Sequence, residues 1–303
     1  MSQIITVFGA TGNQGGSVIR AIQSDTELSS QFKIRAVTRN VSSAAAQELA
    51  TKGVEVVKGD LSSYESVKAA VSGAHTVFLV TNFWESSSRE IEVSQGKTAT
   101  DACKAAGVQH LIFSSMMDAS EVSKGAWVNI HHFDGKAEIE RYIRESAIPA
   151  TFILAGTFMS EVVDMLQKNG DNYVVALPIE GSAKIPFIDV VADTGLFVKA
   201  VIKNREKLLG KQIYASVAYY TFDQIINEFS SVTGKPAVYM KVPEEIFRSF
   251  LPENKAAEIY EMLMLIQEFG YYAGADLAES LELLDGKPTG WKEFLEKNRE
   301  KWE

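Results

Sequence analysis

The first half of the chain alternates between short apolar runs and longer segments whose apolar residues recur at helical spacing. The short runs predict buried strands, and the helical spacing predicts amphipathic helices between them. The predicted strands are residues 4–8, 34–38, 54–58, 76–81, 110–114 and 151–154. The predicted helices are residues 17–22, 44–51, 64–71, 89–106 and 135–146. Strands that alternate with helices in this way predict an α/β fold with a doubly wound parallel sheet.

A glycine-rich turn joins the first predicted strand to the first predicted helix. Residues 7–16 read VFGATGNQGG, so Gly9, Gly12 and Gly15 recur at every third position. Backbone can approach a pyrophosphate closely only where side chains are absent, and the N–H groups at a helix start point outward. The order of strand, glycine turn and helix therefore predicts a dinucleotide site. The alternative is an ordinary tight turn between a strand and a helix.

The residues after the second and third predicted strands indicate which dinucleotide would bind. An acidic residue after the second strand would hydrogen-bond the 2′-hydroxyl of NAD, but the chain has Thr38-Arg39-Asn40 there. A guanidinium is a bidentate partner for phosphate, so Arg39 favours NADP(H), unless it is a surface arginine without a ligand. Asp60, after the third strand, lies where a carboxylate would accept from the adenine amino group, or it caps the next helix.

Beyond Gly156 the alternation becomes irregular. Apolar segments follow at residues 162–166, 185–202, 213–220 and 222–229, and residues 242–269 predict one or two helices. No Pro/Gly/Ser-rich linker separates the halves. We expect a Rossmann domain over residues 1–155 and a smaller, mostly helical second domain over residues 156–303 that packs directly on it. In one interpretation residues 213–220 return to the main sheet, which would make the second domain discontinuous.

Composition and charge exclude several classes of protein. The 303 residues are 46% hydrophobic and 23% charged, as in ordinary globular domains. A net charge of −9 argues against direct nucleic-acid binding, which depends on Lys and Arg. The single cysteine, Cys103, excludes an intrachain disulfide, and we expect it to be buried in packing. The four histidines lack metal-ligand spacing, so no metal site is predicted.

No apolar run is long enough to span a membrane, and no signal peptide precedes the first predicted strand. We therefore expect no membrane association. The expected location is cytoplasmic, with the nucleus as an alternative.

Six strings of residues in the first half resemble one known family. They are GATGNQGG at 9–16, VTRN at 37–40, KGDL at 58–61, VTNFWES at 80–86, QGK at 95–97 and HFDGKAEIE at 132–140. Together they resemble the NmrA-like family, an atypical branch of the short-chain dehydrogenase/reductase superfamily, and within it the NADPH-sensor type. The resemblance weakens after about residue 200, beyond which PTGWKEFL at 288–295 is still similar.

The resemblance implies a set of contacts with NADP(H). The glycine loop would bind through Gly9, Ala10, Thr11, Gly12, Asn13, Gln14 and Gly15, with Arg39 at the 2′-phosphate and Asp60 and Leu61 near adenine. Thr81, Asn82 and Phe83 would line the ribose and pyrophosphate, Lys97 would contact the cofactor, Lys136 would reach the nicotinamide ribose, and Gly156, Thr157, Phe158 and Met159 would lie beside the nicotinamide. In the alternative interpretation each lysine is a solvated charge on a helix.

One substitution separates cofactor binding from catalysis. Typical short-chain reductases use a tyrosine and a lysine four residues later, and the lysine lowers the pKa of the phenol for proton transfer. Four residues before Lys136 the chain has His132, and the nearest tyrosine, Tyr142, projects from a different helix face. His132 either protonates an alkoxide or orients Lys136 or the cofactor. The catalytic candidates are therefore limited to Lys136 and His132.

Two neighbouring serines and one glutamate also bear on the predicted site. Ser114 and Ser115 end the fifth strand, where such enzymes place a carbonyl-polarising serine, or they cap the following segment. Glu140 stands one turn beyond Lys136, and an ion pair between the two is the simple expectation.

Two classes of function remain. In the first, the chain is an NADP(H)-binding redox sensor whose ligand shifts a conformational or oligomeric equilibrium and hence its affinity for a protein partner. In the second, it is an NADPH-dependent reductase of a small carbonyl, quinone or imine. The missing tyrosine and the resemblance to the sensor type favour the first. The sequence leaves open which partner binds and whether the chain forms a homodimer.

Overall fold

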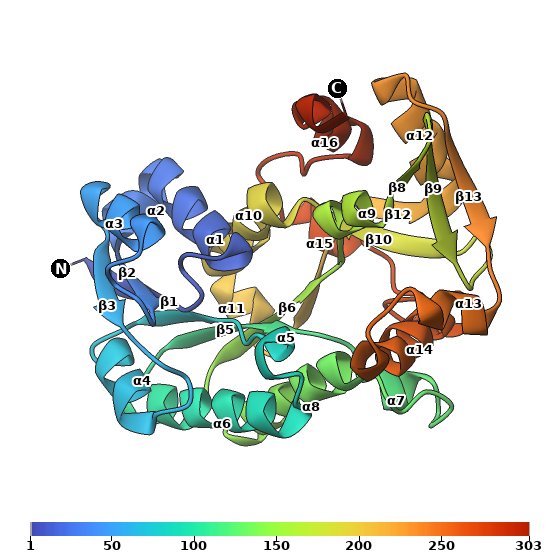
Figure 1. The fold of residues 1–303 in the computed structure, drawn as a ribbon. Coiled ribbons are helices and arrows are strands. Elements are labelled where there is room, and N and C mark those ends of the chain that lie inside the picture. The colour runs from blue at the N-terminus through green and yellow to red at the C-terminus, as the bar shows by residue number, and fades with distance from the viewer. Residues whose placement is uncertain (1, 303) are drawn as a thin grey trace.

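A parallel sheet of seven strands forms the centre of the computed structural model, which describes residues 2–302 (Figure 1). Its strands are β1 (Gln3–Val7), β2 (Phe32–Thr38), β3 (Glu55–Lys58), β4 (Thr76–Leu79), β5 (His110–Ser115), β6 (Ala150–Ala155) and β11 (Gln212–Ala215). In space they follow the order β11-β6-β5-β4-β1-β2-β3. The order reverses between β1 and β4, which opens a crevice at their carboxyl ends. The predicted doubly wound parallel sheet is confirmed.

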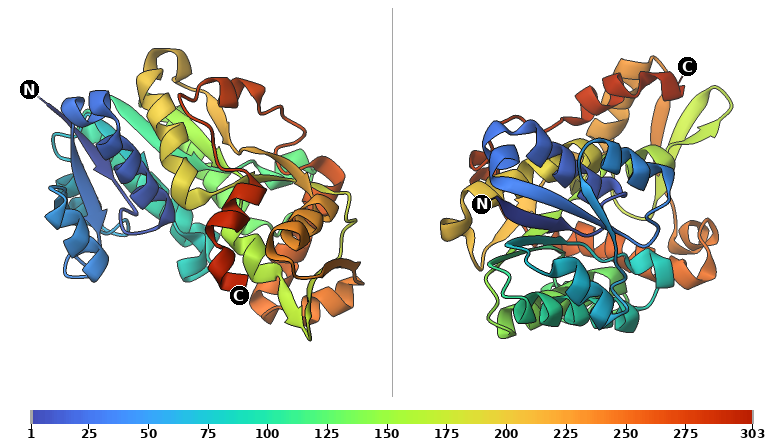
Figure 2. Two further views of the ribbon diagram at one scale, coloured as in Figure 1. Left: turned by 90° about the horizontal axis from the view of Figure 1, so that it is seen from above. Right: turned by 90° about the vertical axis from the view of Figure 1, so that its left-hand side faces the viewer.

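Helices cover both faces of this sheet. One layer contains α1 (Asn13–Ser24), α2 (Thr26–Gln31), α3 (Ala44–Thr51) and α10 (Val190–Lys203), and the other contains α4 (Tyr64–Val71), α6 (Arg89–Ala105) and α8 (His131–Glu145). Figures 1 and 2 show α1 and α10 side by side, although they are far apart in the sequence. The short helices α5 (Phe83–Ser86) and α7 (Ala119–Val122) follow the carboxyl ends of β4 and β5.

The central strands β4, β5 and β6 are buried along their whole length, because helices cover both faces of the sheet there. Phe78 and Ile112 belong to the core beneath α1 and α10, whereas their neighbours Leu79 and Phe113 belong to the core beneath α6 and α8. Successive strand residues point to opposite faces, so each face receives alternate residues of the run.

Apart from α10 and β11, which belong to the main sheet and its helix layer, most residues after Gly156 form a smaller unit that contains two three-stranded sheets. One sheet contains β7 (Thr157–Phe158), β10 (Lys184–Ile188) and β12 (Ala218–Thr221), and the other contains β8 (Gln167–Asn169), β9 (Asn172–Leu177) and β13 (Ala237–Lys241). The helical elements are α9 (Met159–Met165), α11 (Arg205–Leu208), α12 (Phe222–Thr233), α13 (Glu244–Ser249), α14 (Glu253–Phe269), α15 (Ala278–Glu282), α16 (Trp291–Lys297) and the 3₁₀ turn Arg299–Trp302. The sequence did not predict the small sheets, because such short strands leave little periodic pattern.

Residues 213–220, predicted as one returning strand, divide between two sheets. β11 pairs in parallel with β6 in the main sheet, whereas β12 runs antiparallel to β10 in the smaller unit. The chain passes from one sheet to the other at Ser216 and Val217.

Cys103 is fully buried on α6, and burial raises the pKa of its thiol to about 12. The expectation that it serves packing is confirmed by its place in the core. Across residues 2–302, no helix has the length and apolar character needed to cross a bilayer. Within the same residues, no group of three or more His, Cys, Asp and Glu side chains is arranged to hold a metal ion.

Candidate dinucleotide-binding site

The turn between β1 and α1 is built around glycines that admit no side chain. Gly9 has a φ of 64°, and a Cβ atom there would lie 2.7 Å from Val80 Cγ1. A Cβ atom on Gly15 would lie 2.3 Å from the carbonyl oxygen of Gly9, so the helix packs directly on the loop. Gly12 is the N-cap of α1, which no side chain of the described residues caps and which has no acid in its first turn. The N–H groups at this helix start are therefore available to an anion.

A groove of about 610 Å³ lies along this turn and the carboxyl ends of β1 to β4. Its size is suited to a cofactor. The predicted contacts that line it are Gly9, Thr11, Gly12, Asn13, Gln14, Gly15, Arg39, Asp60, Leu61, Thr81, Asn82 and Phe158. The fold thus brings residues from several separate strand ends into one groove.

Arg39 stands at the edge of the groove and already has a partner. Its Nη1 forms an ion pair with Oε1 of Glu85, which belongs to α5. Both side chains are exposed, 63% for Arg39 and 45% for Glu85. Because β1 lies between β2 and β4 in the sheet, this pair crosses the end of β1, where the glycine turn begins. The guanidinium that we expected to bind a 2′-phosphate is therefore already paired with an acid.

Asp60 lines the groove but does not cap the next helix. Ser63 caps α4 by accepting from the backbone N–H of Ser66. The Asp60 carboxylate instead accepts from the N–H of Ser62 at 2.9 Å and holds the loop after β3. The interpretation of Asp60 as a helix cap is therefore wrong, because the chain turns for three more residues before the helix begins.

Lys136 lies directly behind the groove wall, in a buried cluster. Its Nζ donates to Thr81 Oγ1 at 2.9 Å and to the Thr81 carbonyl at 3.2 Å, and it forms an ion pair with Glu92. The Lys136 side chain is 14% exposed and that of Glu92 is 1% exposed. The expected ion pair with Glu140 is wrong, since Glu140 bonds to Arg144 at 2.7 Å. Glu92 therefore compensates the positive charge of Lys136 inside the protein. Thr81, which bonds Lys136, lines the groove.

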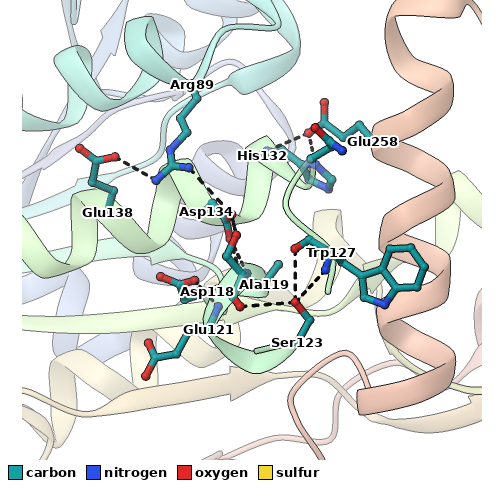
Figure 3. A network of polar contacts seen from close by, with 12 residues as sticks. Arg89, Asp118, Ala119, Glu121, Ser123, Trp127, His132, Asp134, Glu138 and Glu258 are labelled. Carbon is teal, nitrogen blue, oxygen red and sulfur yellow. Dashed lines mark hydrogen bonds and ion pairs between the residues drawn. The ribbon is translucent and has the colours of Figure 1, made fainter. Parts of the chain in front are cut away.

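His132 occupies the position of the missing tyrosine and is bound to α14 (Figure 3). Its Nδ1 lies 2.5 Å from Oε1 of Glu258, and its backbone N–H donates to the same oxygen at 2.8 Å. The rings of Phe83 and Trp84 lie 5.9 and 5.1 Å from the imidazole, centroid to centroid. These contacts hold the imidazole between α5 and α14, and both roles predicted for His132 stay predictions.

Helix α8, which carries His132, also anchors a loop and a charged cluster outside the groove. Asp134 accepts from the backbone N–H of Ala119 at 2.8 Å, and Arg89 lies between Asp134 and Glu138 (Figure 3). Lys97 Nζ lies 3.1 Å from Glu138 Oε1, in a separate groove along α6. The structure therefore does not bring Lys97 to the site that the resemblance implied.

Both serines at the end of β5 donate side-chain hydrogen bonds. Ser114 Oγ donates to Gln14 Oε1 at 2.8 Å, which links β5 to the glycine loop. Ser115 is buried and donates to Glu140 at 2.6 Å. Neither serine caps the following segment, since Asp118 caps α7, so that interpretation is wrong. Ser114 remains next to the loop that would hold a cofactor.

Other predicted contacts lie beside the groove without lining it. They are Ala10, Phe83, Gly156, Thr157 and Met159. Gly156 is required by packing, since a Cβ atom there would lie 2.2 Å from Ser216 Oγ. Of the loop after β6, Phe158 reaches the groove.

Several residues of the site were not predicted. Glu85 and Gln95 line the groove, and both lie within strings that carried the family resemblance. The strings VTNFWES and QGK were therefore the signal that pointed to these two residues. Glu92 and Glu258 carried no signal, because their partners lie 44 and 126 residues away in the chain.

A glycine turn at an uncapped helix start, an arginine after β2 and a groove where the strand order reverses define a dinucleotide-binding α/β protein of the Rossmann type. A family model for the NmrA-like family matches residues 1–295, so the chain belongs to the NmrA-like family. The resemblance found in the sequence is confirmed.

Known proteins similar to the chain include both oxidoreductases and a regulator. It is 32% identical over 264 residues to the NmrA-like family domain-containing oxidoreductase FrzB of Cladobotryum sp, covering 80% of this chain and 77% of FrzB. Its fold is similar to that of NmrA, a negative transcriptional regulator solved in complex with NADP, with a TM-score of 0.82, 23% identity, and coverage of 98% of this chain and 95% of NmrA. The Citrobacter sp. triphenylmethane reductase complexed with NADP(H) gives a TM-score of 0.78, 25% identity, and coverage of 99% and 100%.

Proposed function

We propose that this chain is an NADP(H)-binding regulatory sensor. The groove would hold the pyrophosphate at the start of α1 and the 2′-phosphate at Arg39. Occupancy would shift a conformational or oligomeric equilibrium and so change the affinity for a protein partner. The glycines that admit no side chain support the location of the pyrophosphate.

The state of the two catalytic candidates carries this proposal. His132 replaces the phenol and is held by Glu258, and Lys136 is held by the buried carboxylate of Glu92. Tyr142 donates to Asp101 at 2.8 Å instead of facing this cluster. These three groups are therefore not arranged to transfer a proton to a carbonyl oxygen, although the groove that would bind the cofactor is formed.

A second candidate is an NADPH-dependent reductase of a small carbonyl, quinone or imine. The similarity to FrzB and to the triphenylmethane reductase supports it. Bound NADPH would supply a hydride, and a quinoid or cationic carbon accepts hydride without a proton donor beside that carbon. A site without the phenol is therefore compatible with such acceptors.

The two candidates differ in a simple spectrophotometric assay. Purified protein is mixed with NADPH and a panel of carbonyls, quinones and imines, and the absorbance of the reduced nicotinamide is followed. The sensor proposal expects no substrate-dependent oxidation. Turnover that disappears in Lys136→Ala would overturn it in favour of the reductase.

Binding of the cofactor has its own test. NADP⁺ and NAD⁺ are titrated separately into the wild type and Arg39→Ala by calorimetry. Loss of a charged hydrogen-bond partner should weaken NADP⁺ binding about 10- to 100-fold and leave NAD⁺ binding nearly unchanged. Equal NADP⁺ affinity in both proteins would show that the 2′-phosphate site is elsewhere.

A further inference from the structure

The groove has an unusual charge balance for a ligand that carries several phosphates. The charged side chains that line it are Arg39, Asp60 and Glu85. One base therefore faces two acids, and the base is paired with Glu85. Phosphate binding would depend on the start of α1 and on a guanidinium that an acid of the same groove already occupies.

We infer that Glu85 is an internal competitor for Arg39 and a determinant of cofactor selectivity. The inference rests on the proposed function, which places the 2′-phosphate at Arg39. In the free protein the Glu85 carboxylate occupies the guanidinium, and a 2′-phosphate displaces it on binding. A cofactor with a 2′-hydroxyl carries no anion that needs this guanidinium, so it binds without breaking the pair. Glu85 therefore lowers the preference for NADP(H) over NAD(H).

The exposure of the pair makes this exchange feasible. Ion pairs as exposed as this one contribute about 0–1 kcal/mol, so the Arg39–Glu85 contact can be broken at little cost. A phosphate also offers more acceptor oxygens and more charge to a guanidinium than a carboxylate does. The 2′-phosphate consequently wins the exchange, but with a lower affinity than an unoccupied arginine would give.

Trp84, the residue before Glu85, allows the exchange to be followed by tryptophan fluorescence. Glu85 shares the four-residue helix α5 with Trp84, whose ring also lies 5.0 Å from Lys255 Nζ on α14. The C-cap of α5 is Ser87, which has a φ of 50°, a left-handed conformation that is uncommon outside glycine. Because Glu85 directly follows Trp84 in this helix, we expect its release to change the surroundings of the Trp84 ring.

The experiment compares Glu85→Gln with Glu48→Gln as a matched control. Glu48 is also an exposed glutamate in an ion pair, with Lys52, but it does not line the groove. NADP⁺ and NAD⁺ are titrated into each protein by calorimetry at low salt. We expect Glu85→Gln to bind NADP⁺ about two- to fivefold more tightly with NAD⁺ affinity unchanged, and Glu48→Gln to match the wild type. High salt should reduce the gain, because it screens exposed charges.

The same titrations in an Arg39→Ala background identify the cause. If Glu85 acts by competing for Arg39, adding Glu85→Gln to Arg39→Ala leaves NADP⁺ affinity unchanged. Unchanged or weaker NADP⁺ binding in Glu85→Gln alone, while Arg39→Ala still loses NADP⁺ affinity, would overturn the inference and leave the proposed function standing. Failure of the wild type to bind either dinucleotide would instead overturn the proposed function.

Trp84 supplies a second measurement on the wild-type protein. We expect NADP⁺ to change the tryptophan emission, NAD⁺ to change it less, and Trp84→Phe to remove the difference. Identical emission changes with both cofactors would contradict displacement of Glu85 by the 2′-phosphate.

Discussion

Replacing Glu92 with Gln removes the counter-charge of Lys136 and keeps the size of the side chain. Glu92 is 1% exposed and Lys136 is 14% exposed, so water replaces little of the lost interaction. Removing one partner of a buried ion pair costs about 3–5 kcal/mol, because the other charge is left uncompensated. Lys136 keeps two oxygens of Thr81 as acceptors, so we expect the lower end, a loss of about 3 kcal/mol in the free energy of unfolding.

The assay is urea unfolding of Glu92→Gln, Lys136→Met and the double variant, followed by circular dichroism. Each single variant leaves a buried charge without its partner, whereas the double variant removes both charges. We therefore expect the double variant to lose about 1–3 kcal/mol less than the sum of the single losses. Glu138→Gln is the control. Glu138 pairs with Lys97 and Arg89 on the same helix layer, but it is 32% exposed, so the variant should lose less than about 1 kcal/mol.

Additive losses, or single losses as small as that of the control, would refute the reasoning. Lys136 would then be free of Glu92 in solution and able to serve the cofactor directly. Titration of NADP⁺ into the stable variants separates the two roles. A lysine that contacts the cofactor loses affinity in the double variant too, whereas a purely structural lysine regains it there.

Two further predictions concern the glycine turn and the pH dependence of stability. Gly15→Ala places a Cβ atom 2.3 Å from the carbonyl oxygen of Gly9, so it should weaken NADP⁺ binding at least about tenfold. The control is Gly16→Ala, whose Cβ atom would lie 3.3 Å from a flexible arginine side chain and whose NADP⁺ affinity should stay within about twofold of the wild type. Equal affinities in the two variants would contradict the proposed pyrophosphate site. Burial raises the pKa of Asp193 from 3.8 to about 6, so the folded state holds this proton more tightly than the unfolded state does. The contribution of Asp193 to the free energy of unfolding is therefore fully present below about pH 4 and falls by about 3 kcal/mol as the pH rises through 6, relative to Asp193→Asn. Urea unfolding of both proteins between pH 4 and 7 measures this, and a constant difference between them would show that Asp193 titrates normally.

Local patterns in the sequence determined much of the fold. Helices predicted at residues 44–51 and 64–71 agree with α3 and α4, each of which begins after a serine that caps it. The glycine turn was identifiable because its requirements lie within a few residues: a strand before it, a helix after it and no side chains between. Helix periodicity, capping and turn chemistry act over one or two turns of chain, so a single sequence displays them directly.

The chemistry of the site was decided by tertiary contacts. From Arg39 after β2 the sequence predicted NADP(H) as the cofactor. From His132, four residues before Lys136, it predicted that the usual catalytic tyrosine is absent. It did not predict that Arg39 meets Glu85, 46 residues away. Nor did it predict that Lys136 meets Glu92 instead of Glu140, or that Lys97 faces away from the groove. These pairings depend on strand order and on how α5, α6, α8 and α14 pack, and no local spacing encodes which charged side chains the packing brings within a few ångströms of each other.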